Sequence, residues 1–426
     1  MDKLVSLCKR RGFIFPSSEI YGGLNSCYDY GPLGVELKNK VKAFWWKSMV
    51  QVHENIEGLD SSILMHPKIW EASGHIANFT DPLVDCKKCK NRFRADEVET
   101  KKCPKCGGEL TESRKFNLMF KTFMGPVESD ANIVYLRPET AQGIYVNYQN
   151  VLTSSRQKVP FGIAQIGKAF RNEITPGNFT FRTREFEQME MQYFIRPEND
   201  DEVFETWKKE RIAWYEKLGI KKENLRFHEH GKDELAHYAK RAFDIQYKFP
   251  FGWQELEGIH NRTDFDLKRH QEYSGKNLLY FDEEKKEKYI PYIIETSAGC
   301  DRTTLCILCD AFAEEAERTV LRFAPHLAPI QVAVLPLVNK DGLQEIAHKI
   351  VATLRPFYSV FHDDSGSIGR RYRRQDEAGT PFEITVDYQT KEDHTVTLRE
   401  RDSMQQHRLK IEALQHYLGL RLAPPL

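Results

Sequence analysis

The sequence predicts an α+β fold, in which an antiparallel-sheet domain with a zinc-ribbon-like insertion precedes a smaller α/β domain. Three observations predict it. Strand-like segments broken by Pro, Gly and Asn follow one another closely between residues 115 and 195. Four cysteines lie in two close pairs within residues 86–110, and strand-like and helix-like segments alternate beyond residue 326. We expect domains over residues 1–325 and 326–426.

The first long element is an amphipathic helix over residues 34–52. Its apolar side chains fall on one stripe, formed by Leu37, Val41, Phe44, Trp45 and Met49. An extended segment through residues 63–65 follows and stops at Pro67, because the residue before a proline avoids the helical region. The pattern therefore predicts a helix followed by a strand.

Two Cys-x-x-Cys pairs, Cys86/Cys89 and Cys103/Cys106, interrupt this domain over residues 86–110. Each pair presents two thiolates to one ion, and the spacing is typical of a tetrahedral structural zinc site. The alternative, two disulfides, fits poorly with a reducing compartment and with nine cysteines in all. Cys306 and Cys309 have the same spacing, but they lie on an apolar helical face and are expected to be core residues.

A β-hairpin is predicted around the loop of residues 174–180. Side chains alternate along a strand, so Arg171 and Glu173 share one face of the first strand, and one face of the second carries Arg182, Arg184, Phe186, Gln188 and Glu190. Guanidinium groups bind phosphate, an aromatic ring stacks on a base, and carboxylates accept hydrogen bonds from amines. This wall suits a nucleotide beside an amine; the alternative is a solvated, ion-paired face of a sheet.

The elements after the hairpin predict a mainly helical insertion over residues 196–250 and then a return to the sheet. A helix over residues 200–220 aligns Phe204, Trp207, Trp214 and Leu218. A strand over residues 289–299 then runs into a helix over residues 301–318. The second domain alternates strands at residues 330–337, 357–361, 381–388 and 395–402 with helices at 343–354, 368–377 and 411–418.

The charge balance directs any nucleic-acid contact to a local patch. The chain has 62 basic and 62 acidic side chains, so bulk charge does not attract nucleic acid. The helix over residues 368–377 offers such a patch around Tyr372, formed by Arg370, Arg371, Arg373 and Arg374. The alternative is a solvated face balanced by Asp376 and Glu377. No long apolar run predicts a membrane span, and basic residues break the first apolar stretch, so we expect a cytoplasmic protein with no membrane partner.

The hairpin, with Phe170-Arg171-Asn172-Glu173, resembles the second signature motif of class II aminoacyl-tRNA synthetases. The helix, strand and Pro67 resemble their first motif, and the run from Ser297 to Arg302 resembles their third. Four further segments are similar to the dimeric glycyl-tRNA synthetases: residues 18–23 (SEIYGG), 29–34 (DYGPLG), 137–143 (RPETAQG) and 261–267 (NRTDFDL).

This resemblance implies ATP-dependent attachment of glycine to tRNA(Gly) through glycyl-adenylate, with Mg²⁺, in a homodimer whose second domain binds the anticodon. It implies catalytic roles for Arg171 and Arg302 on the phosphates, and Glu255 as a magnesium ligand. The implied ATP-binding residues are Arg171, Asn172, Glu173, Phe181, Arg182, Arg184, Phe186, Glu255, Leu256, Gly299 and Arg302. The implied glycine-binding residues are Arg94, Glu139, Gln188, Glu190, Glu295, Ser297 and Gly299.

Two alternatives stay open from the sequence. A synthetase-like RNA- or DNA-binding protein without catalysis would have no use for the complete ATP set, which argues against it. A synthetase of the same class for another amino acid would need a side-chain pocket. Glu139 and Glu190 without such a pocket favour glycine.

Overall fold

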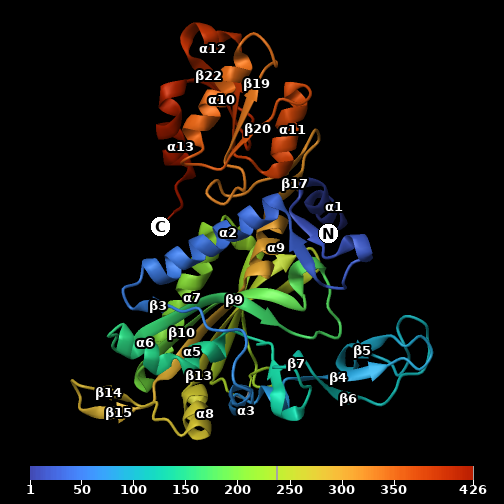
Figure 1. Cartoon of the computed structure of the whole chain (residues 1–426), viewed down its shortest axis with the longest axis vertical. Helices are drawn as coiled ribbons and strands as arrows, with labels where there is room; N and C mark the ends of the chain where they lie inside the picture. The colour runs from blue at the N-terminus through green and yellow to red at the C-terminus, as the bar shows by residue number, and fades with distance from the viewer. Residues whose placement is uncertain (237, 426) are drawn as a thin grey trace.

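A seven-stranded sheet forms the centre of the larger part of the molecule (Figure 1). The computed structural model describes residues 1–236 and 238–425. The strand order is β11-β12-β13-β16-β10-β9-β3, and all neighbours are antiparallel except β3 and β9. The strands are β3 (Ile56–Gly58), β9 (Phe161–Phe170), β10 (Glu185–Ile195), β11 (Leu225–Glu229), β12 (Arg241–Phe249), β13 (Gly252–Thr263) and β16 (Tyr292–Gly299).

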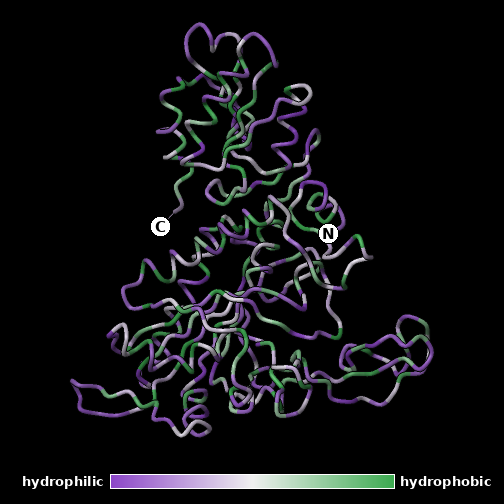
Figure 2. Tube along the Cα trace, in the orientation of Figure 1, coloured by the Kyte–Doolittle hydropathy of each residue, from purple (hydrophilic) through white to green (hydrophobic). Residues whose placement is uncertain are grey.

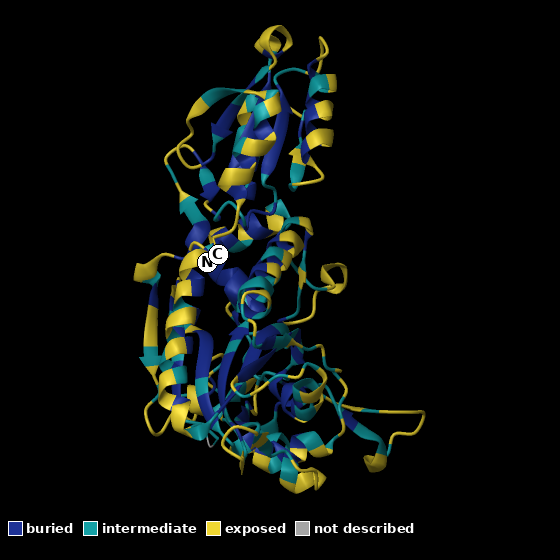
Figure 3. Ribbon diagram, turned by 90° about the vertical axis from the view of Figure 1, so that its left-hand side faces the viewer, coloured by how far each residue is buried: buried dark blue, intermediate teal, exposed yellow. Residues whose placement is uncertain are grey.

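Helices cover both faces of this sheet because its strands alternate apolar side chains between two cores. On β9, Phe161 and Ile163 pack with α5 (Ala141–Val146), α6 (Tyr148–Ser154) and α8 (Phe265–Ser274). Ala164 faces the opposite core, which contains α2 (Pro32–Trp46), α7 (Asp200–Lys217) and α9 (Cys300–Ala311). Apolar residues accordingly concentrate along the strands (Figure 2), and the strands are buried while the helices keep an exposed face (Figure 3).

The first expected strand is wrong in position. A π-helical turn, Lys47–Gln51, continues α2, and the strand that follows is β3 rather than residues 63–65. Pairing with β9 ends after Leu59, because Ser61 donates its backbone N–H to the side chain of Gln165 (3.2 Å) instead of to a backbone carbonyl. Leu64 makes only an isolated bridge with Leu136.

The hairpin forms, but its strands end earlier than expected. β9 ends at Phe170 and β10 begins at Glu185, so residues 171–184 are a loop. Its own backbone bonds close this loop, including Arg171 N–H to Arg184 O (2.9 Å) and a 3₁₀ turn, Phe179–Phe181. The predicted alternation therefore holds for Phe186, Gln188 and Glu190 on β10 but not for the two arginines before it.

The segment of residues 196–250 is not mainly helical, which corrects the prediction. Helix α7 is followed by β11 and β12, which extend the central sheet. The apolar side chains of Phe243, Ile245, Tyr247 and Phe249 recur every second residue and are buried, as a strand requires. Helix α9 is also shorter than expected and gives way to the hairpin β17 (Phe312–Glu314) and β18 (Thr319–Leu321).

The cysteine-bearing insertion is a three-stranded sheet that projects from the domain (Figure 1). It contains β4 (Thr80–Asp85), β5 (Arg92–Arg94) and β6 (Arg114–Asn117). The remaining elements of this part are α1 (Asp2–Arg11), β1 (Ile14–Pro16), β2 (Tyr28–Tyr30), α3 (Lys68–Ala72), α4 (His75–Asn78), β7 (Lys121–Phe123), β8 (Ile133–Tyr135), β14 (Tyr280–Asp282) and β15 (Glu287–Tyr289). Cys306 is fully buried in the main core and Cys309 packs against it, as predicted.

A second, five-stranded sheet with its own core forms the C-terminal domain. The order is β20-β19-β21-β22-β23, with the first three strands parallel. Its strands are β19 (Val332–Pro336), β20 (Val360–His362), β21 (Phe382–Val386), β22 (Thr395–Glu400) and β23 (Gln406–Lys410); its helices are α10 (Leu343–Leu354), α11 (Ile368–Ala378), α12 (Tyr388–Asp393) and α13 (Leu414–Leu422). The sequence did not predict β23 or α12.

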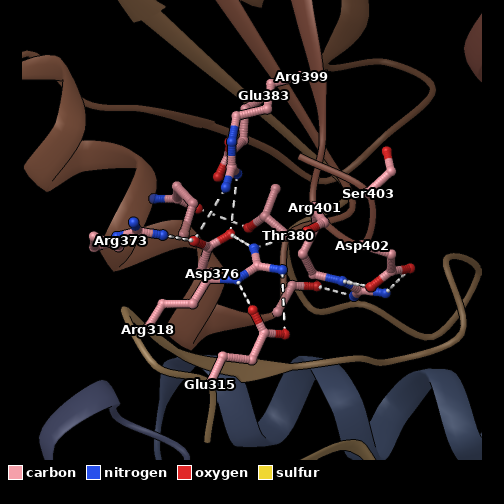
Figure 4. A network of polar contacts seen from close by, with 12 residues as sticks. Glu315, Arg318, Arg373, Asp376, Thr380, Glu383, Arg399, Arg401, Asp402 and Ser403 are labelled. Atoms are coloured by element: carbon pink, nitrogen blue, oxygen red, sulfur yellow. Dashed lines mark hydrogen bonds and ion pairs between the residues drawn. The ribbon is translucent and has the colours of Figure 1, made fainter. Parts of the chain in front are cut away.

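A buried ionic network joins the two domains (Figure 4). Asp376 of α11 is fully buried and accepts hydrogen bonds from Arg318 beside β18 (2.9 Å) and from Arg399 of β22 (3.0 Å). Arg401 donates to the backbone carbonyl of Phe323 at 2.8 Å.

Within the described ranges, no helix combines the length and apolar character needed to cross a membrane.

Candidate active site

A cavity of about 180 Å³ opens over the central sheet where β10, β13 and β16 lie side by side. Three alternate residues of each strand share its floor: Phe186, Gln188 and Glu190 of β10; Glu295, Ser297 and Gly299 of β16; and Gly258, His260 and Arg262 of β13. The register pairs Glu190 with Ser297, and Gln188 with Gly299. The floor therefore runs from a carboxylate-rich end at Glu295 and Glu190 to an end at Phe186.

Arginines line the end of the cavity near Phe186. Arg171 donates from Nε to the carbonyl of Pro138 (3.0 Å) and lies over the Phe186 ring, 5.3 Å from its centroid. Arg302, at the start of α9, donates from Nε to the carbonyl of Phe181 (3.1 Å) and pairs with Glu255 at 3.1 Å. Arg302 beside it holds the pKa of Glu255 below its usual range. This end offers guanidinium groups and an aromatic face, which suit a nucleotide.

Two of the three carboxylates at the other end have charged or titratable partners. His75 Nε2 lies 3.5 Å from Glu139. Burial opposes ionisation of Glu139, but His75 and then Arg262 bring the pKa of Glu139 below its usual range. Glu295 accepts from Arg262 (3.1 Å) and lies 2.7 Å from His260 Nδ1. Burial raises its pKa, but Arg262 and then His260 bring the pKa well below the usual range.

Among the described residues, the third carboxylate, Glu190, forms hydrogen bonds only with neutral side chains. It is 2% exposed, accepts a hydrogen bond from the Thr140 hydroxyl and accepts another from Gln192 Nε2 at 2.9 Å. Burial, and then the charges of Glu295 and Glu139, raise the pKa of Glu190 well above its usual range. This end of the cavity has an excess of acidic groups and is suited to a cation such as an amine.

Similarity to known proteins assigns the chain to a family. The sequence is 63% identical over 424 residues to a glycine–tRNA ligase of Treponema denticola, which covers 96% of this chain and 94% of the relative. The chain belongs to the glycine–tRNA ligase family. A glycine–tRNA ligase of Borreliella burgdorferi is 57% identical and covers 98% of this chain and 96% of the relative. A glycine–tRNA ligase of Thermobifida fusca is 53% identical and covers 99% of this chain and 98% of the relative.

Two family models match this glycine–tRNA ligase family member. "tRNA synthetase class II core domain (G, H, P, S and T)" matches residues 126–311, and "Anticodon binding domain" matches residues 331–419. A crystal structure of prolyl-tRNA synthetase from Cryptosporidium parvum, complexed with halofuginone and AMPPNP, superposes with a TM-score of 0.71. It is 15% identical and covers 99% of this chain and 75% of that one, which shows the same fold. The predicted class II fold is confirmed.

Most residues predicted for the site of this ligase line the cavity, and four do not. Arg94 is ion-paired with Asp81 and Asp96 in the insertion. Arg184 donates to the backbone carbonyls of Asn25 and Glu173, which fixes the loop of residues 171–184. Leu256 is buried in the core, and Asn172 lies outside the cavity and pairs its backbone with Leu118. Each of these four residues has a structural partner outside the cavity, and the contacts with ATP or glycine expected of them stay predictions.

Further residues that the sequence analysis did not assign to the site also line the cavity of the ligase, among them Arg262, His260 and Tyr238. Arg262 and His260 follow Gly258 at every second position of β13, so strand periodicity could have found them. Tyr238 stacks on Arg262, with the guanidinium carbon 3.8 Å from the ring centroid. No sequence pattern places Tyr238 there, because it comes from an irregular segment between β11 and β12.

The four cysteines of the insertion converge, and their ligand atoms all lie within 4.8 Å of one another. The Sγ–Sγ distances are 3.5 Å for Cys86 and Cys106 and 3.7 Å for Cys89 and Cys103. Disulfide sulfurs would be about 2.05 Å apart. Tetrahedral zinc with Zn–S bonds of about 2.3 Å requires sulfurs about 3.8 Å apart, so the four thiols fit that ion.

The arginines predicted for tRNA contact separate into two groups. Arg371 is 1% exposed and donates to the backbone carbonyls of Pro336 and Asp363, so it supports the fold of α11 and does not face RNA. Its expected role is therefore wrong. The other three line a groove of about 810 Å³ beside Tyr372, together with Arg11 and Arg399: they are Arg370, Arg373 and Arg374.

Proposed function

We propose that this protein attaches glycine to tRNA(Gly) at the expense of ATP, through a glycyl-adenylate intermediate. The observation that carries the proposal is the polarity of one cavity, with arginines at one end and three carboxylates at the other. An amino acid with a positive ammonium and a reacting carboxylate fits between the carboxylates and an ATP phosphate. The names of its relatives support glycine as that amino acid.

In the first step, the glycine carboxylate attacks the α-phosphate of ATP and pyrophosphate leaves. The nucleophile is already ionised, so no general base is required. Arg171 and Arg302 neutralise and align the phosphates, and Phe186 stacks on the adenine. Glu255 would hold Mg²⁺, which supplies further neutralisation of phosphate charge when bound. Glu173 lies in the same lining, where it can accept from the adenine amine.

Selectivity for glycine follows from what the cavity lacks. Glu139, Glu190 and Ser297 can accept or order the ammonium. Among the described residues, no Ala, Val, Leu, Ile or Met side chain lines the cavity, so a larger amino acid finds no apolar pocket. A missing methylene alone gives about 1–3 kcal/mol of discrimination, but an added methyl group in filled space also clashes.

In the second step, we propose, a terminal ribose hydroxyl of tRNA attacks the carbonyl carbon of glycyl-adenylate, an ester bond forms, the bond to the phosphate oxygen breaks and AMP leaves. The groove lined by Arg370, Arg373 and Arg374 offers cations beside Tyr372, which suits the phosphates and unstacked bases of an anticodon loop. The resemblance to the dimeric enzymes supports a homodimer formed through α2 and β3. The cytoplasm, where tRNA and ATP are available, is the proposed location.

We also propose a structural zinc ion in the insertion, bound by Cys86, Cys89, Cys103 and Cys106. Metal analysis of the purified chain is expected to find about one zinc per chain, because four thiolates complete a closed structural site. Cys103→Ser should reduce that content to near zero, while Cys27→Ser, which removes a thiol outside the cluster, should leave it unchanged. Equal zinc content in all three proteins would contradict the site.

Exchange of labelled pyrophosphate into ATP tests the proposed function without tRNA. Exchange is expected in the presence of glycine, because adenylate formation is reversible. The same assay with alanine or serine is expected to give little exchange, since neither has a pocket for its side chain.

A further inference from the structure

Glu190 differs from the other two carboxylates of the cavity because, among the described residues, no cationic side chain forms a hydrogen bond or ion pair with it. His75 lies 3.5 Å from Glu139, and Arg262 donates to Glu295 at 3.1 Å. The partners of Glu190 are the Thr140 hydroxyl and the Gln192 amide, both neutral. An ionised carboxylate that is 2% exposed and has only neutral partners is costly, so this group takes up either a proton or an external cation.

The cations near Glu190 offset this cost only in part, because their hydrogen bonds go to other acceptors. Arg262 directs four hydrogen bonds to Asp266 and Glu295. Arg137, from the segment after β8, donates to the carbonyls of Lys168 (2.6 Å) and Ser61 (2.8 Å). Other titratable or charged groups also face this end. They are His75 of α4, Glu139 just before α5, Tyr145 of α5, Asp266 of α8, His260 of β13 and Glu295 of β16.

The hydrogen bonds of Glu190 are compatible with a proton. Thr140 Oγ1 and Gln192 Nε2 contact different carboxylate oxygens, and the hydroxyl of Thr140 can either donate or accept. A protonated Glu190 can therefore donate to Thr140, while its other oxygen still accepts from Gln192. Glu190 also lines the cavity next to Ser297, where an incoming ammonium has access to it.

We propose that Glu190 holds a proton in the empty site and releases it to solvent when the ammonium of glycine binds; this inference rests on the proposed function. The ammonium then supplies the positive charge that the proton supplied before. Atoms and charges balance: the O–H bond of the carboxyl group breaks, its proton goes to the buffer, and the carboxylate accepts an N–H hydrogen bond. Glycine binding is thereby coupled to pH through one residue.

The sign of the pH dependence follows from competition. Protons and ammonium compete for the same carboxylate, so lowering the pH weakens glycine binding. At pH values below the raised pKa of Glu190, the affinity for glycine is expected to fall about tenfold for each unit by which the pH is lowered. In Glu190→Gln the side chain cannot ionise, so this pH dependence should disappear.

Calorimetry and infrared spectroscopy on the full chain test the inference together. Titration with glycine at neutral pH, in buffers with different ionisation enthalpies, is expected to show release of about one proton per bound glycine. The infrared difference spectrum should show loss of the carbonyl band of a protonated carboxyl group. Persistence of that band with proton release would mean that glycine, not Glu190, loses the proton, and would overturn the inference.

Two variants, Glu190→Gln and Glu383→Gln, identify the carboxyl group that loses its proton. The carboxyl band lost on glycine addition should be missing from Glu190→Gln even if that variant binds glycine weakly. Glu383→Gln removes another buried carboxyl group whose pKa is raised, by burial, to about 8, but which lies in the C-terminal domain; the glycine-dependent band should persist there. Glycine binding by the wild-type chain without proton release overturns the inference alone, whereas no glycine binding overturns the proposed function as well.

Discussion

Arg171→Ala is expected to lower glycine-dependent pyrophosphate exchange by about 100- to 1,000-fold, the cost of removing one preorganised donor from a charge-stabilising site. Arg171 lies over Phe186 at the cationic end of the cavity, so its loss removes neutralisation of the phosphate under attack. Arg171→Lys should recover only part of the rate, because an ammonium keeps the charge but not the planar fork of donors.

Arg114→Ala is the matched control for this experiment. Arg114 belongs to β6 in the insertion, is exposed, and pairs with Asp85 on the surface. Its removal should leave exchange unchanged, and both variants should keep the circular dichroism spectrum of the wild type. Near-normal exchange by Arg171→Ala would mean that the loop of residues 171–184 does not bind the phosphates.

Asp376→Ala is expected to lower the free energy of unfolding by about 3–5 kcal/mol, the typical cost of removing one partner from a buried ionic network. Asp376 is 0% exposed and accepts hydrogen bonds from Arg318 and Arg399, which are themselves buried (Figure 4). Without the carboxylate, two guanidinium groups lose their shared counter-ion at the junction of the domains. Denaturant unfolding followed by circular dichroism measures the loss.

Asp402→Ala provides the comparison, because Asp402 pairs with Arg401 nearby but its side chain is 55% exposed. Arg401 is buried, but it keeps the backbone carbonyls of Gly379 and Phe323 as acceptors, and a half-exposed carboxylate contributes little, so this variant should lose much less stability than Asp376→Ala. If Asp376→Ala cost no more than Asp402→Ala, the network would not stabilise the junction between the domains.

Periodicity predicted those parts of the site that lie on regular strands. Phe186, Gln188 and Glu190 alternate along β10 and face one cavity, as the sequence indicates. The same rule failed for Arg184, because the chain there is a loop closed by its own hydrogen bonds. Arg184 also donates hydrogen bonds to the carbonyls of Ser26 and Asn25, which are far away in the chain, and local sequence spacing does not predict such contacts.

Burial of charged residues was the other feature that the sequence could not supply. Arg370, Arg371, Arg373 and Arg374 are consecutive cations around one tyrosine, yet the side chain of Arg371 turns inward to backbone carbonyls. Arg262 is likewise buried, because Asp266 and Glu295 meet it from another helix and strand. In both cases tertiary packing determines the partners of the buried arginine. The apolar stripes of α7 and α10, in contrast, are predicted by helical periodicity alone.

Pyrophosphate exchange measured with a panel of amino acids shows whether one polar cavity joins a nucleotide to an amino acid without a side chain. With ATP, Mg²⁺ and no tRNA, we expect strong exchange with glycine and only weak exchange with alanine, serine or any larger amino acid. Exchange with alanine or serine above that with glycine would contradict the specificity of the cavity. Exchange with no amino acid would contradict catalysis itself and leave a binding protein with a synthetase fold.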